Sequence, residues 1–232
     1  MQNKITCSDI LHKIYSEKKH LNIQYVFIFD IDDTIFDTSY RRFFIYEKFL
    51  RKEFKLPRIN FYLQKKHYNF IPLLEKDSIF QEKYYKILDR YYNLFLSESF
   101  LILDKPYCGI KSFLQSLNWL KIPILFLTGR YSPNLKTATQ YLLKKYDLIS
   151  PQMTNFLFMK PNMKISDKNF KKLELNSIIN LYPERKIIIF DNESENCEIF
   201  NEILPKNSTI IRFNSVQRKI CQYRGFLLEN WI

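Results

Sequence analysis

The stretch Val26-Phe27-Ile28-Phe29-Asp30-Ile31-Asp32-Asp33-Thr34 is the feature around which the chain is organised. Its apolar first half indicates a buried strand, and aspartates and a threonine follow directly. Packing does not explain this ending, because a carboxylate near the interior of a sheet must be hydrogen-bonded, paired or metal-bound. In an extended chain Asp30 and Asp32 point the same way and can address one substrate. Two carboxylates and a hard divalent cation suit phosphoryl transfer; the alternative is an acidic turn in which Asp33 or Thr34 caps a following helix.

The composition limits the classes of protein. With 46% apolar and 17% aromatic residues, the 232-residue chain predicts one sizeable folded core, with or without a small inserted lobe. Three glycines, Gly109, Gly129 and Gly225, are too few and too far apart for a glycine-rich phosphate loop or a dinucleotide fingerprint. This argues against a P-loop kinase and a nicotinamide dehydrogenase. The four cysteines show no paired spacing, so neither a zinc knuckle nor a disulfide framework is indicated.

Charge and hydropathy bear on location and partners. The sequence shows no signal peptide and no apolar run approaching the roughly 20 residues that span a bilayer, so we expect a cytoplasmic protein without a membrane partner. The net charge of +12 favours polyanionic partners or substrates. The chain is also rich in Lys, Asn, Ile, Tyr and Phe, as expected of an AT-rich coding sequence. Coding bias is therefore the alternative source of the charge.

Apolar runs alternate with helical periodicity along most of the chain. Besides the strand that ends at Asp30, the predicted strands are 124–127, 156–159, 186–190 and 209–213. The predicted helices are an amphipathic lead-in within 1–24, then 109–120, 133–145, 170–182 and 193–204. This alternation predicts an α/β fold, a Rossmann-like three-layer sandwich with a central parallel sheet covered on both faces.

Residues 38–103 depart from this alternation. Apolar residues recur at helical spacing over 39–54, up to Pro57, and over 78–96, and little in between suggests a strand. The aromatic stripes of these helices are interpreted as packing surfaces. The chain therefore predicts a core made of residues 1–37 and 104–232, interrupted by a small helical cap insert over 38–103.

Polar residues end three of the predicted strands. The first ends at Asp30 and Asp32, the second at Thr128-Gly129-Arg130, and a later one at Asp191. In a parallel sheet these ends lie on one edge, and adjacent strands are about 4.8 Å apart. These side chains could therefore surround one phosphate group.

With these motifs, residues 24 to about 213 resemble the haloacid dehalogenase-like (HAD) superfamily of phosphohydrolases. Phe29-Asp30-Ile31-Asp32-Asp33-Thr34 is similar to the first motif of that family, whose aspartate pair separates phosphatases from dehalogenases. The stretches Leu103–Gly109 and Phe126–Arg130 resemble the second-motif region, and Asp191-Asn192-Glu193 the acidic fourth motif. Thr139 with Tyr141-Leu142 resembles the acid-phosphatase-like and polynucleotide-phosphatase-like branches. One departure is Asp33, where many members have glycine.

The resemblance implies roles for these residues. Asp30 would attack phosphorus to form an aspartyl-phosphate, and Asp32 would protonate the leaving alcohol and later take a proton from water. Thr128 would hydrogen-bond a phosphoryl oxygen, with Gly129 and Arg130 beside the substrate.

The resemblance also implies a Mg²⁺ site. The ligands would be the side chain of Asp30, the main-chain carbonyl of Asp32 and the side chain of Asp191, with waters completing the octahedron. Glu193 or Glu195 would contact these ligands without binding the metal directly. The alternative for Asp191 is a helix N-cap.

The family also has a lysine in the first turn of the helix before the Asp191 strand, where Lys168, Lys171 and Lys172 all qualify. Lys171 is favoured and Lys172 is second, because Lys171 shares a face with apolar residues and a buried lysine requires a partner. Those apolar residues are Leu175, Ile178 and Tyr182. Lys160 is a further alternative as the substrate-facing residue of the preceding strand.

The insert is strongly basic. Between Tyr40 and His67 it holds nine Lys and Arg residues against two glutamates, an excess of seven positive charges. The basic residues are at 41, 42, 48, 51, 52, 55, 58, 65 and 66. A basic cap predicts a substrate with negative charge beyond its phosphate, such as a nucleotide or a nucleic-acid end; the alternative is a solvated surface.

The leading hypothesis is thus a Mg²⁺-dependent phosphomonoester hydrolase. A binding or scaffold protein that keeps the fold without turnover is one alternative, although the retained Asp30, Asp32, Thr128 and Asp191 argue against it. A phosphomutase is the other, and only substrate data would separate it.

Overall fold

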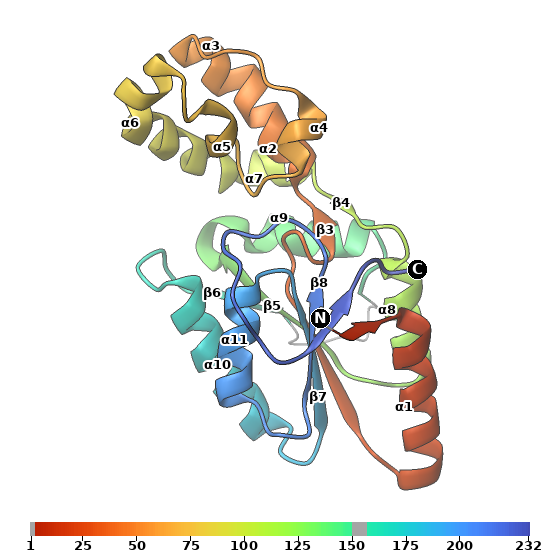
Figure 1. The fold of residues 1–232 in the computed structure, drawn as a ribbon. Helices are drawn as coiled ribbons and strands as arrows, with labels where there is room; N and C mark the ends of the chain where they lie inside the picture. The colour runs from red at the N-terminus through yellow and green to blue at the C-terminus, as the bar shows by residue number, and fades with distance from the viewer. Residues whose placement is uncertain (1–2, 150–156) are drawn as a thin grey trace.

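The computed structural model describes residues 3–149 and 157–232, and a seven-stranded sheet lies at its centre (Figure 1). All of its neighbouring strands are parallel. Their order across the sheet is β1 (Asn3–Ile5), β9 (Phe226–Leu228), β8 (Thr209–Phe213), β7 (Lys186–Asp191), β2 (Tyr25–Phe29), β5 (Ile124–Tyr131) and β6 (Leu157–Lys160). The acidic stretch therefore follows β2, between β7 and β5, as the strand-end argument requires.

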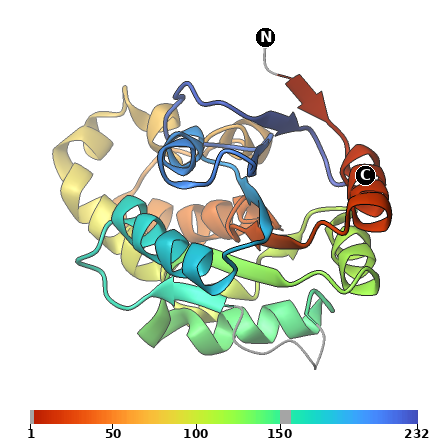
Figure 2. The same ribbon diagram turned by 90° about the horizontal axis from the view of Figure 1, so that it is seen from below.

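Helices cover both faces of the sheet (Figures 1 and 2). One face carries α1 (Cys7–Leu21), α8 (Ile110–Trp119) and α9 (Ser132–Lys145); the other carries α10 (Asp167–Leu181) and α11 (Ser194–Ile203). Successive residues of β2 serve opposite faces, as a pleated strand dictates: Phe27 and Phe29 pack with the first group, and Val26 and Ile28 with the second. This confirms the predicted three-layer, Rossmann-like α/β fold.

The segment between β2 and α8 forms a separate helical layer at the carboxyl edge of the sheet (Figure 1). Its elements are α2 (Ser39–Ile45), the π-helical turn η1 (Tyr46–Leu50), α3 (Arg51–Phe54), α4 (Phe61–Lys65), α5 (Ile71–Leu74), α6 (Ser78–Phe95) and α7 (Glu98–Leu101). They enclose their own hydrophobic cluster, which includes Tyr46, Phe70 and Ile87. We propose that residues 38–103 form a cap domain and that residues 1–37 and 104–232 form the core.

Two short strands mark where the chain leaves and re-enters the core. β3 (Phe36–Asp37) pairs antiparallel with β4 (Lys105–Pro106).

Among residues 3–149 and 157–232, no helix is long and apolar enough to cross a membrane.

Several element boundaries differ from the predictions. The helix predicted over 39–54 is interrupted by η1, and β5 continues through Thr128-Gly129-Arg130 instead of ending before them. The predicted strand at 156–159 corresponds to β6, but its first residue lies outside the described residues. β1, β3, β4 and β9 were not predicted, because two or three residues carry no measurable periodicity and their partners lie far away in the sequence.

Candidate active site

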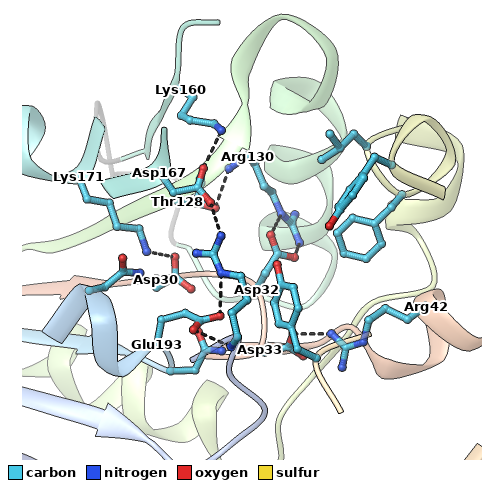
Figure 3. Close-up of a pocket in the computed structure, with 18 of the residues that line it drawn as sticks. Asp30, Asp32, Asp33, Arg42, Thr128, Arg130, Lys160, Asp167, Lys171 and Glu193 are labelled. Atoms are coloured by element: carbon cyan, nitrogen blue, oxygen red, sulfur yellow. Dashed lines mark hydrogen bonds and ion pairs between the residues drawn. The ribbon is translucent and has the colours of Figure 1, made fainter. Parts of the chain in front are cut away.

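All the predicted site residues except Asp191 line one cavity of about 260 Å³ between the carboxyl edge of the sheet and the cap (Figure 3). Asp191 does not line it and is connected to it through its contact with Lys171. Its core side includes Asp30, Asp32, Thr128, Gly129, Arg130 and Lys171. Its cap side includes Tyr68, Tyr91, Tyr92, Phe95 and Leu96. The helix α6 was interpreted as a packing element, and its aromatic residues do pack in the cap cluster, yet they also form one wall of this cavity.

Lys171 joins the first and fourth motifs. Its Nζ lies 2.7 Å from Asp30 Oδ1 and 2.6 Å from Asp191 Oδ2, and all three side chains are buried. Thr34 Oγ1 donates to the other oxygen of Asp30 at 3.2 Å. The two carboxylates, which come from neighbouring strands, are thus held around one ammonium group.

The geometry distinguishes between the lysines that the sequence offered as candidates for the site. The helix α10 begins after Ser166, whose hydroxyl accepts from the backbone N–H of Asn169. This start turns Lys171 toward the sheet, whereas Lys168 and Lys172 are exposed. Lys160 also lines the cavity, where its Nζ pairs with Asp167 at 2.6 Å.

The charge around Asp30 fits an additional cation. The pKa of Asp30 is raised to about 8: burial is the main cause, Lys171 opposes it, and the neighbouring Asp191 adds to it. When both are ionised, the two buried carboxylates outweigh the charge of the one lysine, and their oxygens are the ligands that Mg²⁺ prefers. A cation bound there would favour the ionised form of Asp30. Within the described residues no three Asp, Glu, His or Cys side chains form a metal cluster. The carboxylates of Asp30 and Asp191 are a donor set that fits an ion which keeps several waters and takes one or two carboxylates, as Mg²⁺ does.

Asn196 is a site residue that sequence analysis missed. Its Nδ2 lies 3.1 and 3.0 Å from the two oxygens of Asp191, and the backbone N–H of Glu193 donates to Asp191 Oδ1 at 2.9 Å. Asp191 therefore accepts bonds from the first turn of α11 without being its N-cap residue, which is Glu193. The position of Asn196 one turn into this helix is the signal that could have indicated it.

Asp32 lies between two arginines. Arg130 binds it through Nε at 3.0 Å and Nη2 at 2.8 Å, and Arg41 of the cap binds it through Nη2 at 2.9 Å. The fully buried Asp104 pairs with the same arginines, at 2.8 Å from Arg130 and 3.1 Å from Arg41. Burial alone would raise the pKa of Asp32, but Arg130 and Arg41 hold it well below its usual range. Arg41 and Asp104 were not predicted as members of the site.

The turn after Asp32 shows how Asp33 fits at the position where the first-motif resemblance implies a glycine. Asp33 has φ +55°, in the left-handed region that glycine, asparagine and aspartate tolerate best. Its buried carboxylate accepts bonds from Thr38 and from Arg42 of α2. Asp33 therefore forms the turn and also ties the first cap helix to the core.

Comparisons with known proteins support this fold. No protein-family model matches the sequence, and no curated protein matches it. Among solved structures, the chain is similar to a candidate phosphatase from Clostridium difficile, with a TM-score of 0.63, 14% identity, and 90% of this chain and 95% of the other covered. It is also similar to a HAD-superfamily hydrolase of subfamily IA from Geobacter sulfurreducens, with a TM-score of 0.58, 11% identity and coverage of 90% and 93%.

A third similar structure contains ligands. It is a HAD family hydrolase from Deinococcus radiodurans with bound phosphate and sodium, with a TM-score of 0.54, 10% identity, and 82% of this chain and 80% of the other covered. At these identities the likeness establishes the fold. The protein therefore has the fold of the HAD-superfamily hydrolases, and the acid-phosphatase-like or polynucleotide-phosphatase-like branch stays a prediction.

Proposed function

We propose that the protein is a phosphomonoester hydrolase of the HAD type that acts through an aspartyl-phosphate. The observation that supports this most is the bridge from Lys171 to Asp30 and Asp191, in a cavity that Thr128 and Asp32 also line. A buried nucleophile, a hydroxyl and a second carboxylate at one sheet edge suit the transfer of a phosphoryl group.

Two displacements follow from these positions. In the first, an Asp30 oxygen bonds to phosphorus, the bond from phosphorus to the leaving oxygen breaks, and the leaving oxygen takes a proton from Asp32. In the second, water attacks the aspartyl-phosphate, Asp32 takes its proton, and Asp30 is released together with inorganic phosphate. Lys171 holds Asp30 in place, and the Thr128 hydroxyl is positioned to donate to a phosphoryl oxygen.

The contacts of Asp32 set a condition on this cycle. Arg41 and Arg130 favour its ionised form, which is ready to accept a proton from water. To donate a proton in the first displacement, Asp32 must first take one up, which requires these contacts to weaken. Because Arg41 belongs to the cap, movement of the cap would remove its contact, whereas the contacts from Arg130 come from the core strand β5.

The metal proposed for this site is Mg²⁺. Asp30, Asp191 and the main-chain carbonyl of Asp32 would hold it, and Asn196 would orient Asp191. When bound, the ion supplies positive charge that offsets the charge of the phosphate and the carboxylates.

The test is hydrolysis of a generic aryl phosphate with and without Mg²⁺. We expect turnover that EDTA abolishes and that Asp30→Asn and Asp32→Asn each reduce by several orders of magnitude, with the fold retained by circular dichroism. Asp191→Ala should reduce it sharply. Wild-type-like turnover by folded Asp30→Asn protein would disprove the mechanism. No turnover of any phosphomonoester by the wild type would favour the binding-protein alternative, and transfer of phosphate to a second hydroxyl would favour a phosphomutase.

A nucleotide or a nucleic-acid end is the narrower substrate proposal. It rests on the positive charge of residues 41–66 and gains support from the aromatic wall of the cavity, because Tyr and Phe rings stack well on bases. The structure also reduces the charge that supports it: Arg41 and Arg42 are 1% and 2% exposed and are paired with core aspartates.

A further inference from the structure

The segment after β8 is attached to the candidate active site. We call residues 214–221 the C-terminal strap. Ser215 Oγ donates to the main-chain oxygen of Asp33 at 2.5 Å, and Asn192 Nδ2 donates to the main-chain oxygen of Val216 at 2.6 Å. Ser194 Oγ adds a bond to the main-chain oxygen of Lys219 at 2.9 Å. The strap is therefore fixed to both the first and the fourth motif.

This attachment places Arg218 in the cavity. Its backbone N–H donates to Glu193 Oε2 at 2.9 Å, and Arg218 lines the cavity together with Asp30 and Lys171. The guanidinium carbon lies 5.6 Å from the centre of the Tyr68 ring, so Arg218 sits where the strap meets the cap.

Arg218 has unused hydrogen-bonding capacity. Its guanidinium carries five N–H donors, of which only Nε–H makes a hydrogen bond among the described residues, to Glu193 Oε1 at 3.3 Å. Nη1 lies 3.6 Å from Asp167 Oδ2, which is an ion pair beyond hydrogen-bond distance. The side chain is 41% exposed.

The other arginines that contact the site differ from Arg218. Arg41, Arg42 and Arg130 are at most 2% exposed and are paired with Asp32, Asp33 and Asp104. Lys171 is likewise committed to two aspartates. Arg218 thus combines access to the cavity with donors in a planar fork, the geometry that matches a carboxylate or a phosphate.

We propose that Arg218 is a specificity-determining residue that binds a second anionic group, a phosphate or a carboxylate, on the leaving group of the substrate. The proposal rests on the proposed phosphomonoesterase function, because it assumes that the first phosphate lies at Asp30. The preferred substrates are then phosphomonoesters with a second negative charge at the junction of strap and cap.

Two matched ligand pairs test the proposal by binding. The first pair is adenosine 3′,5′-bisphosphate and adenosine 5′-monophosphate, which differ by one phosphate. The second is phosphoglycolate and ethyl phosphate, which differ by one carboxylate. Calorimetry with the Asp30→Asn protein measures each Kd without turnover, and Arg218→Gln and Lys219→Gln are added to this background. Lys219 is the matched control, because it is an exposed neighbour of the same charge that does not line the cavity.

We expect roughly tenfold tighter binding of the doubly anionic member of at least one pair, as for a charge-assisted hydrogen bond. Arg218→Gln should bring the two Kd values together, and Lys219→Gln should keep them apart. The pair that responds identifies the anion as phosphate or carboxylate. Equal Kd values within both pairs, no binding by any ligand, or a preference that survives Arg218→Gln would overturn the proposal. Failure of the proposed function is a separate result: the preference is present, but wild-type protein with Mg²⁺ releases no phosphate from any of the four ligands.

Discussion

The surroundings of Lys171 show most clearly that it is a buried structural residue and not a surface lysine. A buried ammonium is costly unless it is paired, and here it lies within 2.7 Å of two carboxylates. Removing the Lys171 ammonium would leave two buried carboxylates facing each other, which is unfavourable. Removing the ammonium of its neighbour Lys172 would have no such effect, because Lys172 is exposed.

We therefore expect Lys171→Met to lower the free energy of unfolding in the absence of metal by about 3 kcal/mol, as for a buried ion pair that loses one partner. Mg²⁺ should raise the Tm of this variant more than that of the wild type, because the ion meets a more negative site. Urea denaturation and thermal melts with and without Mg²⁺ measure both effects. Lys172→Met is the matched control, and an equal loss in that variant would contradict the assignment.

At the scale of elements, the connection between β2 and α2 combines two effects of opposite sign. Asp33 adopts a left-handed backbone that glycine would adopt at lower cost, yet its carboxylate is the partner of the buried Arg42. Asp147, after α9, has a similar φ of +52°, but among residues 3–149 and 157–232 its carboxylate pairs only with Lys111, in an exposed ion pair. The two positions therefore separate backbone strain from charge pairing.

Replacing each aspartate by glycine should give opposite results. Asp147→Gly should be neutral or stabilising by up to about 1 kcal/mol, because the backbone relaxes and an exposed ion pair contributes little. Asp33→Gly should lower the free energy of unfolding by roughly 2–4 kcal/mol, because Arg42 loses its buried partner. Urea denaturation of both variants provides the measurement. Equal changes at the two sites would show that Asp33 does not anchor α2.

At the scale of the whole molecule, the cap and the core share their charges. Of the nine basic residues between Tyr40 and His67, Arg41 and Arg42 neutralise core aspartates, Lys65 pairs with Asp37, and Arg51 pairs with Glu47 within the cap. Lys48, Lys52, Lys55, Arg58 and Lys66 remain exposed. They do not line the cavity, so they can contact only those parts of a substrate that extend away from its reacting phosphate.

The nucleic-acid prediction can be tested on this surface. If a polynucleotide binds there, replacing Arg51, Lys52 and Lys55 together by Gln should raise KM for a phosphorylated oligonucleotide and leave kcat unchanged. The salt dependence of kcat/KM should also become shallower, by up to about 2 in log–log slope. The control is the same change in charge at Lys136, Lys144 and Lys145, exposed residues of α9. The deciding quantity is kcat/KM for the oligonucleotide divided by kcat/KM for an aryl phosphate. If neither salt nor the cap substitutions change this ratio, a nucleic-acid partner is excluded.

The sequence by itself determined the α/β fold, and it predicted the helical insert and the positions of Asp30, Asp32, Thr128 and Asp191 at strand ends. The physical reason is that periodicity is local and the carboxyl ends of parallel strands share one edge. Lys171 was favoured by the same local argument, from the apolar face of its helix, but only the tertiary structure showed the aspartates around it. The structure alone decided which distant residues meet.

These long-range contacts include Arg130 on Asp32, 98 positions apart, and the strap residue Arg218 on Glu193, 25 positions apart. They include β1 on β9 as well, which joins the two ends of the described chain. Such contacts depend on how strands order themselves in a sheet and how a cap packs on it. No pattern within a helix or a strand records that, because side-chain periodicity reports which face is buried and not which residue lies opposite.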